Sequence, residues 1–236
     1  MSDEQWCFSL PALLRLQGWL SPAFPTGSYS YSHGLEWAVE AGLIYDRGSL
    51  GDWLEADLSY GSGRNEAILF SEAWHGARRD DRDSLLQIAE LAGALRGTSE
   101  FALESRQQAW ACLATFRRVW PEPVLEWLFQ ALHKNHIQPA LGVVLGVQLA
   151  RQPIPASSAL AGFLQSYTAN LVNAGVRLIP LGQTDGQLLI AELEEAVLTA
   201  AAQAKAATIR DLGSAAFCVD LASMAHETQY TRLFRS

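Results

Sequence analysis

The chain has 236 residues, of which 49% are hydrophobic and 18% charged, so it can bury a sizeable core and does not belong to the class of disordered proteins. Its formal net charge of −8 repels phosphate backbones and anionic lipids. This charge argues against general binding to nucleic acids or membrane surfaces. No apolar run reaches the length of about 18 residues that is needed to span a bilayer.

The cysteines and the start of the chain predict a cytoplasmic protein. Cys7, Cys112 and Cys218 are far apart and include no CxxC pair. An odd number of scattered cysteines argues against a disulfide framework and favours a reducing compartment. Residues 1–4 are acidic, whereas a secretory signal would begin with basic residues.

Helical periodicity runs through almost the whole chain and predicts an all-α fold of roughly ten helices. The linkers are short and none marks a domain boundary, so we expect one domain over residues 1–236. The predicted helices span residues 10–20, 31–41, 50–60, 65–79, 85–95, 98 or 99 to about 120, 124–134, 140–150, 157–178 and 188–206.

Three local signals define expected helix ends. Ser49 with Asp52, and residues 184–187, resemble capping boxes that start the helices after them. Residues 61–63, Gly-Ser-Gly, are expected to close the helix before them. Residues 213–236 lack clear helical periodicity, so we expect this tail to be mobile or ordered by a partner.

The usual signatures of enzymes are largely missing from the sequence. No GxxxxGK[ST] phosphate loop is present, so this chain is not expected to hydrolyse nucleotides. Residues 30–34, Ser-Tyr-Ser-His-Gly, are the closest match to GxSxG, and a hydrolase that uses Ser32 is one alternative function. His133 and His136 could share a helix face and bind a metal, which is a second alternative, but no further ligand supports them and we expect no metal site.

Three segments carry more information. In residues 20–38, two prolines and a glycine turn the chain before alternating hydroxyls and aromatics, and an ordinary turn between helices would explain this. In residues 170–187, Arg177 lies in an apolar run and needs either a carboxylate or helix carbonyls as a partner. Residues 222–236 gather Tyr, Arg, Leu and Phe, which are typical of binding interfaces, although such a tail could also dock on its own domain.

Together these segments resemble the UreF family of urease accessory proteins. Residues 21–38 match SPAxPxGxxSxSxGLEWA, residues 174–183 match AGVRLxPLGQ, and residues 226–236 match HETQYSRLFRS with Thr231 in place of Ser. Two departures are visible. Ala225 stands where the family often has Arg, and the stretch around Cys218 lacks the proline often found there.

The resemblance implies an all-helical, dimeric protein that catalyses no reaction itself. UreF-like proteins bind the accessory protein UreD, called UreH in some organisms, and recruit the GTPase UreG to deliver nickel to apo-urease. Nickel and GTP would therefore act through partners, with no cofactor bound directly to this chain. Tyr29 and Arg232 match positions that look important for assembly with the GTPase. The partner-binding residues implied are Tyr29, His226, Glu227, Gln229, Tyr230, Arg232, Leu233, Phe234 and Arg235. The structural or interface residues implied are Pro25, Gly27, Gly34, Glu36, Arg177, Pro180, Gly182 and Gln183.

Overall fold

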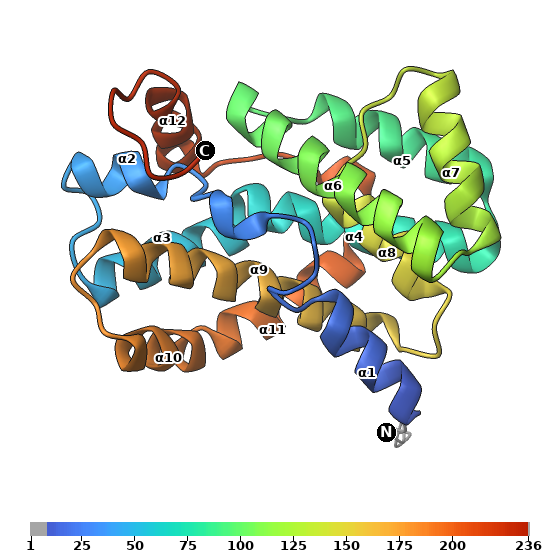
Figure 1. Cartoon of the computed structure of the whole chain (residues 1–236), viewed down its shortest axis with the longest axis horizontal. Helices are drawn as coiled ribbons and strands as arrows, with labels where there is room; N and C mark the ends of the chain where they lie inside the picture. Colours follow the sequence, from blue (N-terminus) through green and yellow to red (C-terminus); the bar gives the residue numbers. More distant parts are fainter. Residues whose placement is uncertain (1–8, 236) are drawn as a thin grey trace.

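The computed structural model describes residues 9–235, and within this range the chain forms twelve α-helices and no strand (Figure 1). The predicted all-α fold is confirmed. Predictions for residues 1–4, Cys7 and Ser236 lie outside the described range. The α-helices are α1 (Leu10–Trp19), α2 (Leu35–Glu40), α3 (Arg47–Tyr60), α4 (Ser62–Arg79), α5 (Arg82–Ala94), α6 (Ser99–Val119), α7 (Pro123–Lys134), α8 (Leu141–Ala150), α9 (Ala156–Leu178), α10 (Gln183–Glu192), α11 (Glu194–Ala206) and α12 (Phe217–His226). Two short 3-10 helices are η1 (Ser28–Ser30) and η2 (Ile209–Asp211).

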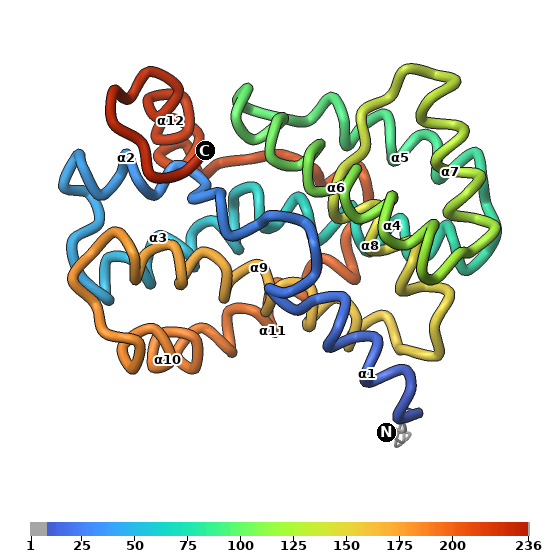
Figure 2. Tube along the Cα trace, viewed as in Figure 1, coloured from blue at the N-terminus to red at the C-terminus, as the bar shows by residue number. Residues whose placement is uncertain are grey.

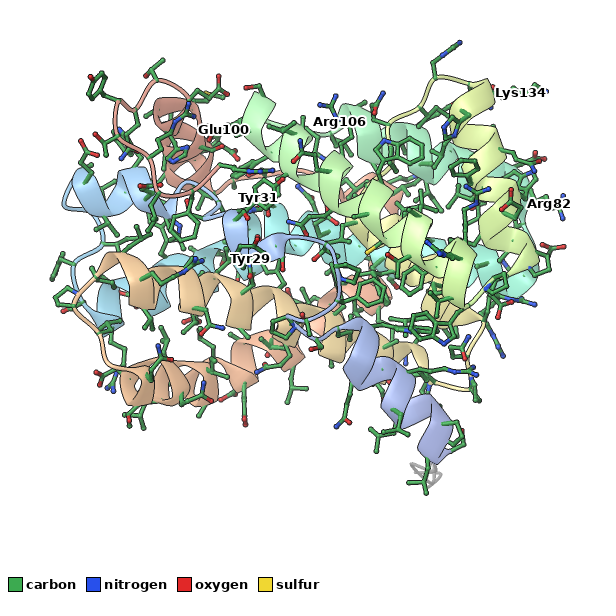
Figure 3. The ribbon with its side chains drawn as sticks, in the orientation of Figure 1. Tyr29, Tyr31, Arg82, Glu100, Arg106 and Lys134 are labelled. Carbon is green, nitrogen blue, oxygen red and sulfur yellow. The ribbon has the colours of Figure 1, made fainter. Side chains whose placement is uncertain are left out.

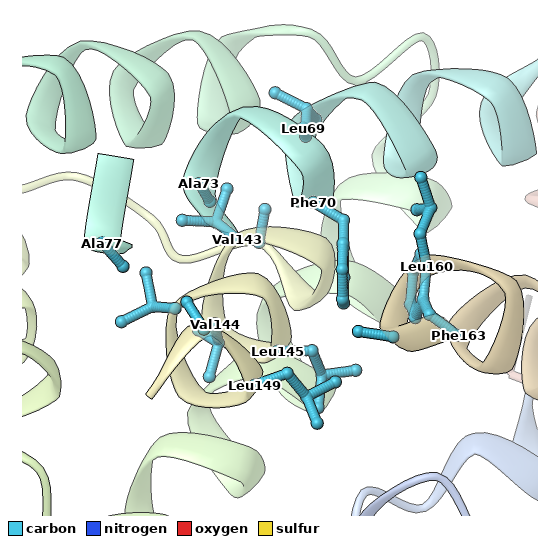
Figure 4. Packing of buried hydrophobic residues seen from close by; sticks show 14 of the residues in the cluster. Leu69, Phe70, Ala73, Ala77, Val143, Val144, Leu145, Leu149, Leu160 and Phe163 are labelled. Atoms are coloured by element: carbon cyan, nitrogen blue, oxygen red, sulfur yellow. The ribbon is translucent and has the colours of Figure 1, made fainter. Parts of the chain in front are cut away.

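Helix α8 is buried along nearly its whole length, as its sequence predicts, in which Gln148 is the one polar residue. It packs closely against α4, and Figure 4 shows Val143 and Val144 of α8 near Ala73 of α4. At Gly146, a Cβ atom would lie only 2.5 Å from the carbonyl oxygen of Phe70. A glycine is therefore required for this close approach of the two helices. None of the helices in residues 9–235 is long and apolar enough to cross a membrane.

The buried side chains form two main clusters. The larger cluster draws most of its side chains from α4 to α9 and from α11. The second cluster joins α2, α3, α9 and α10, and it also includes Ala222 of α12 and Phe234 near the end of the chain. Figure 2 shows the last described residues lying beside the segment between α1 and α2. The C-terminal tail is therefore part of the folded body.

The helix predicted over residues 31–41 is shorter than expected. Residues 28–30 form η1, and α2 begins only at Leu35. His33 and Gly34 have positive φ angles of 59° and 78°, which a right-handed helix does not permit. The chain therefore turns sharply just before α2.

Helix α3 begins earlier than expected because its capping residue is Asp46. The carboxylate of Asp46 accepts from the N–H of Ser49 at 2.8 Å, and the Ser49 hydroxyl contacts the Asp46 N–H at 3.0 Å. Ser49 is thus the third residue of a capping box and does not open the helix with Asp52.

Residues 61–63 do not close α3 as a loop, since α4 begins directly at Ser62. The buried carboxylate of Asp57 accepts from the N–H groups of Ser62 and Gly63, at 2.9 and 3.3 Å. A side chain from the preceding helix therefore supplies the N-terminal cap of α4. The sequence pattern alone gave no sign of this cap, in which Asp57 binds residues five and six positions further along the chain.

Three further predictions of helix structure were wrong. The helix expected over residues 188–206 is two helices, α10 and α11, which meet at Leu193. The N-cap of α10 is Gly182, so Thr184 lies inside the helix. The tail expected to lack periodicity contains α12, whose buried residues Val219, Ala222, Ser223 and His226 follow helical spacing. Small and polar side chains on that buried face hid the pattern.

A glycine-to-alanine pair tests the packing of α4 against α8. We expect Gly146→Ala to lower the free energy of unfolding by about 1–3 kcal/mol, because a backbone carbonyl cannot move aside as a flexible side chain can. Gly18→Ala is the control, because a Cβ atom there has no neighbour within 4 Å in an exposed part of α1. It should stabilise the chain by up to about 1 kcal/mol through helix propensity. Denaturant unfolding measures both, and equal effects would contradict the proposed contact.

Candidate partner-binding surface

The inner side of the tail is fixed by the carboxylate of Glu36 on α2. The backbone N–H of Leu233 donates to Glu36 Oε1 at 2.6 Å, and that of Phe234 donates to Oε2 at 2.8 Å. The Phe234 ring is only 4% exposed and belongs to the second core cluster. The next N–H, of Arg235, donates to the carbonyl of Ser30 at 2.8 Å. Three successive residues thus tie the end of the chain to the segment around α2.

His226, the last residue of α12, lies fully buried between two carboxylates. Its Nδ1 is 2.8 Å from Glu100 Oε2, and its Nε2 is 3.2 Å from Glu36 Oε2. Arg232 Nη1 donates to the other oxygen of Glu100 at 3.1 Å. Burial raises the pKa of Glu100, while His226 and Arg232 act in the opposite direction. These four side chains join α2, α6 and α12 to the tail.

Helix α12 also touches the turn before α2 through backbone atoms. At Gly34, a Cβ atom would lie 2.8 Å from the backbone nitrogen of Ser223. The Ser223 hydroxyl lies 2.7 Å from that of Thr98, which is the N-cap of α6. The Glu227 carboxylate accepts from the N–H of Ser99 at 3.2 Å. The start of α6 is therefore bound by residues from the C-terminal end of α12.

The outer side of the same region is exposed and rich in large side chains. Tyr29 and Leu233 are each 65% exposed, and Tyr230 is fully exposed. On α12, a stripe at helical spacing also faces outward, and it consists of Phe217, Leu221 and Met224. These large side chains are therefore exposed to water on Tyr29, on the tail and on α12.

Arg177 links the Tyr29 loop to the tail. Its Nη2 donates to the carbonyl of Tyr29 at 2.7 Å, and its guanidinium carbon lies 4.2 Å from the centre of the Phe234 ring. Its partners are therefore carbonyls and an aromatic face, with a longer contact of 3.4 Å from Nε to the Asn173 carbonyl. Figure 3 shows Tyr29 beside α9 and Glu100 beside α12. Residues from both ends of the chain meet here.

Comparison with known proteins identifies the family. The UreF family profile matches residues 44–194. The "Urease accessory protein UreF" of Rhodopseudomonas palustris strain TIE-1 is 46% identical over 95% of this chain and 92% of its own length. Proteins of the same name from Bradyrhizobium diazoefficiens and Magnetococcus marinus are 45% and 43% identical over 95% of this chain, covering 92% and 98% of their own lengths. This chain belongs to the UreF family. It is therefore placed among accessory proteins and not among enzymes.

Five of the positions that the UreF resemblance singled out form turns away from the tail contacts. Pro25 lies in the turn between α1 and η1. Pro180, Gly182 and Gln183 form the exposed corner between α9 and α10, where the Gly182 N–H donates to Asp185 at 3.0 Å. Gly27 has a φ of 72° and precedes η1. These residues shape connections, whereas Gly34, Glu36 and Arg177 contact the tail region directly.

The structure of this UreF-family chain also places the residues of the two enzyme alternatives. Ser32 is fully buried, and its hydroxyl accepts from the N–H of Glu36 at 3.4 Å at the start of α2. His133 lies on α7 with Nδ1 2.9 Å from the carbonyl of Phe129, while His136 follows the helix with a φ of 56°. The two histidines therefore do not share a helix face, which removes the geometry that the metal-site alternative required. Among residues 9–235, no group of three or more His, Cys, Asp or Glu residues is arranged to hold a metal ion.

His33 is a satisfied buried histidine at the edge of a cavity of about 90 Å³. Its Nδ1 is 3.0 Å from Glu104 and its Nε2 is 2.9 Å from the Ser62 hydroxyl. Burial lowers the pKa of His33, but the charge and hydrogen bond of Glu104 outweigh this effect and leave the pKa raised. The ring also stacks on Phe101, with 4.3 Å between centroids. We assign these contacts to the packing of α4 against α6.

Sequence reasoning missed Glu100 and Ser223, which hold the tail on its inner side. Glu100 follows the N-cap of α6, where an acidic residue is expected for the helix dipole alone. Ser223 sits in a run of small residues without a motif. No local signal marks either residue, because each acts on a partner more than 120 positions away.

Two glycines with the same backbone conformation test the contact between α12 and the turn before α2. Gly34 and Gly27 both have φ near 75°, but a Cβ atom at Gly27 has no neighbour within 4 Å. Gly27→Ala should therefore cost only the strain of a left-handed alanine, about 1–2 kcal/mol. Gly34→Ala should cost about 1–3 kcal/mol more, because it also pushes against the α12 backbone. Denaturant unfolding measures the difference, and equal losses would show that α12 does not rest on Gly34.

Proposed function

We propose that this chain is a scaffold for urease maturation that links UreD (UreH) to the GTPase UreG during nickel insertion into apo-urease. In this proposal it works in the cytoplasm as a homodimer. Nickel and GTP are handled by the partners, and this chain binds no cofactor itself. The family membership supports the role of an urease accessory protein. The resemblance of the sequence motifs supports the named partners and the dimer.

One observation carries the proposal of a docking surface. The tail is held by its inner side through Glu36, Glu100 and the Phe234 ring, while Tyr230 and Leu233 point outward. An exposed Tyr on a fixed backbone is a good interface anchor, because little conformational freedom is lost on binding. Tyr29 adds a second exposed anchor, and its loop is fixed by Arg177.

The exposed stripe on α12 extends this surface. Phe217, Leu221 and Met224 would lose contact with water on binding, which favours association. We propose that the stripe, Tyr29 and the outer side of the tail together bind the two partners. Further ordering of residues 213–236 by a partner remains part of this proposal.

Point substitutions at exposed positions test the proposal better than truncation does. Deleting residues 232–236 would also remove Phe234 from the core cluster and leave Glu36 without two donors. Tyr29→Ala and Tyr230→Ala instead remove side chains that face water. Tyr45→Ala is the matched control, because Tyr45 is also well exposed, on the loop between α2 and α3.

We expect Tyr29→Ala and Tyr230→Ala to weaken co-purification with UreD and UreG, with a loss of affinity of about 30-fold for a residue worth 2 kcal/mol. Both variants should also lower urease activation in cells. Tyr45→Ala should retain both. Circular dichroism should show the same helix content for all three variants. Full recovery of the complex and of urease activation by both test variants would overturn the proposed surface.

A further inference from the structure

We propose that Glu36, His226 and Glu100 form a proton-dependent latch for the tail. The latch holds only while the three side chains together carry one proton more than a neutral imidazole and two ionised carboxylates would carry. This inference concerns the docking of the tail on its own domain and does not depend on the proposed partners. It starts from the two short contacts of His226, one from each ring nitrogen.

Counting donors shows why the additional proton is needed. A neutral imidazole has one N–H group and one bare nitrogen, and an ionised carboxylate only accepts. With Glu36 and Glu100 both ionised, one contact of a neutral His226 would bring lone pairs together at 2.8 or 3.2 Å. A second proton, on the ring or on Glu100, turns that contact into a hydrogen bond. Either location of the proton gives both ring nitrogens a hydrogen bond.

Further donors from the tail also bind the two carboxylates. Glu36 accepts from the N–H groups of Leu233 and Phe234, and Glu100 accepts from Arg232. These donors fix the orientation of both carboxylates, so neither can turn away from His226 without losing a bond. The cluster is thus rigid as well as buried.

The balance of charges in the cluster also requires the additional proton. Arg232 neutralises one of the two buried carboxylates, and the shared proton neutralises the other. Other charged groups nearby bind outside the cluster: Glu40 of α2 bonds Gln229, Glu104 of α6 bonds His33, and Glu227 bonds the N–H of Ser99. Of the nearby cations, Arg177 donates to the Tyr29 carbonyl and the Arg235 side chain bonds Tyr31. Without the proton, an unbalanced negative charge would be buried, which is costly.

The direction of the pH effect follows from linkage. A histidine in a free tail has a pKa of about 6.5, so it loses its proton near neutral pH. Docking requires the additional proton, whereas the free tail does not, so docking takes up a proton wherever a free histidine is neutral. Docking is therefore at full strength below about pH 6.5 and weakens as the pH rises above that value.

The amides of Leu233 and Phe234 report this latch directly, since both donate to Glu36. The experiment is hydrogen–deuterium exchange of the full chain between pH 6 and 9, with each rate divided by that of the unstructured amide at the same pH. We expect the protection of both amides to fall with rising pH, by up to tenfold per pH unit, the limit for one linked proton. Protection that stays constant across this range would overturn the proposal.

Two variants separate the latch from general effects of pH. In Glu100→Gln, the side-chain oxygen can still accept from Arg232, and the amide nitrogen can donate to a neutral His226. Protection should then no longer depend on pH. Glu40→Gln is the matched control, because Glu40 bonds the tail through Gln229 at the surface and should leave the wild-type slope unchanged.

If amide protection in Glu100→Gln depends on pH as strongly as in the wild-type chain, the latch is contradicted. His226→Gln provides a second check if Glu100→Gln releases the tail altogether, because it also removes the titrating ring and should abolish the slope. If both variants leave the two amides unprotected at every pH, the latch is judged only by how the protection of these amides depends on pH in the wild-type chain.

Discussion

The end of the chain is held by two buried carboxylates that come from different helices and meet at one histidine. Glu36 and Glu100 contact His226 from opposite sides, and they also bind the backbone and the arginine of the tail. Buried carboxylates are stable only when their acceptor sites are filled. The positions of α2, α6 and α12 are therefore mutually dependent, and so is the turn at Gly34 against which α12 rests.

This constraint brings residues from both ends of the chain onto one surface. The Tyr29 loop is bound by Arg177 and Arg235, and the same Arg177 lies over the Phe234 ring. A change in the conformation of the tail would alter the position of the Tyr29 loop through these contacts, although the two segments are about 200 positions apart in sequence. In a scaffold, such coupling would let one partner influence the surface offered to another.

The sequence predicted the helical fold well and the tail contacts poorly. The long helices α6 and α9 and the buried α8 were found within one or two residues, because apolar periodicity and prolines mark them clearly. Helix α12 was missed because Ala, Ser and His line its buried face. Arg177 was recognised as needing a partner, but its partners, the Tyr29 carbonyl and the Phe234 ring, come from distant segments. Contacts of that kind depend on the assembled fold, and no local pattern encodes them.

The central claim is that the tail is docked on its own domain, and a distance measurement tests it most directly. Spin labels at Tyr230→Cys and Tyr45→Cys, both exposed positions, can be introduced after Cys7 and Cys218 are replaced by Ser, since Cys112 is buried. The labelled chain is diluted with an excess of unlabelled chain, so that distances between two protomers do not contribute. Double electron–electron resonance near pH 6.5, without partner proteins, should then give one narrow distance distribution. Its width should match that of a control pair at Tyr45 and Tyr60, which lie on the folded body. A broad distribution that narrows only when UreD is added would contradict the claim.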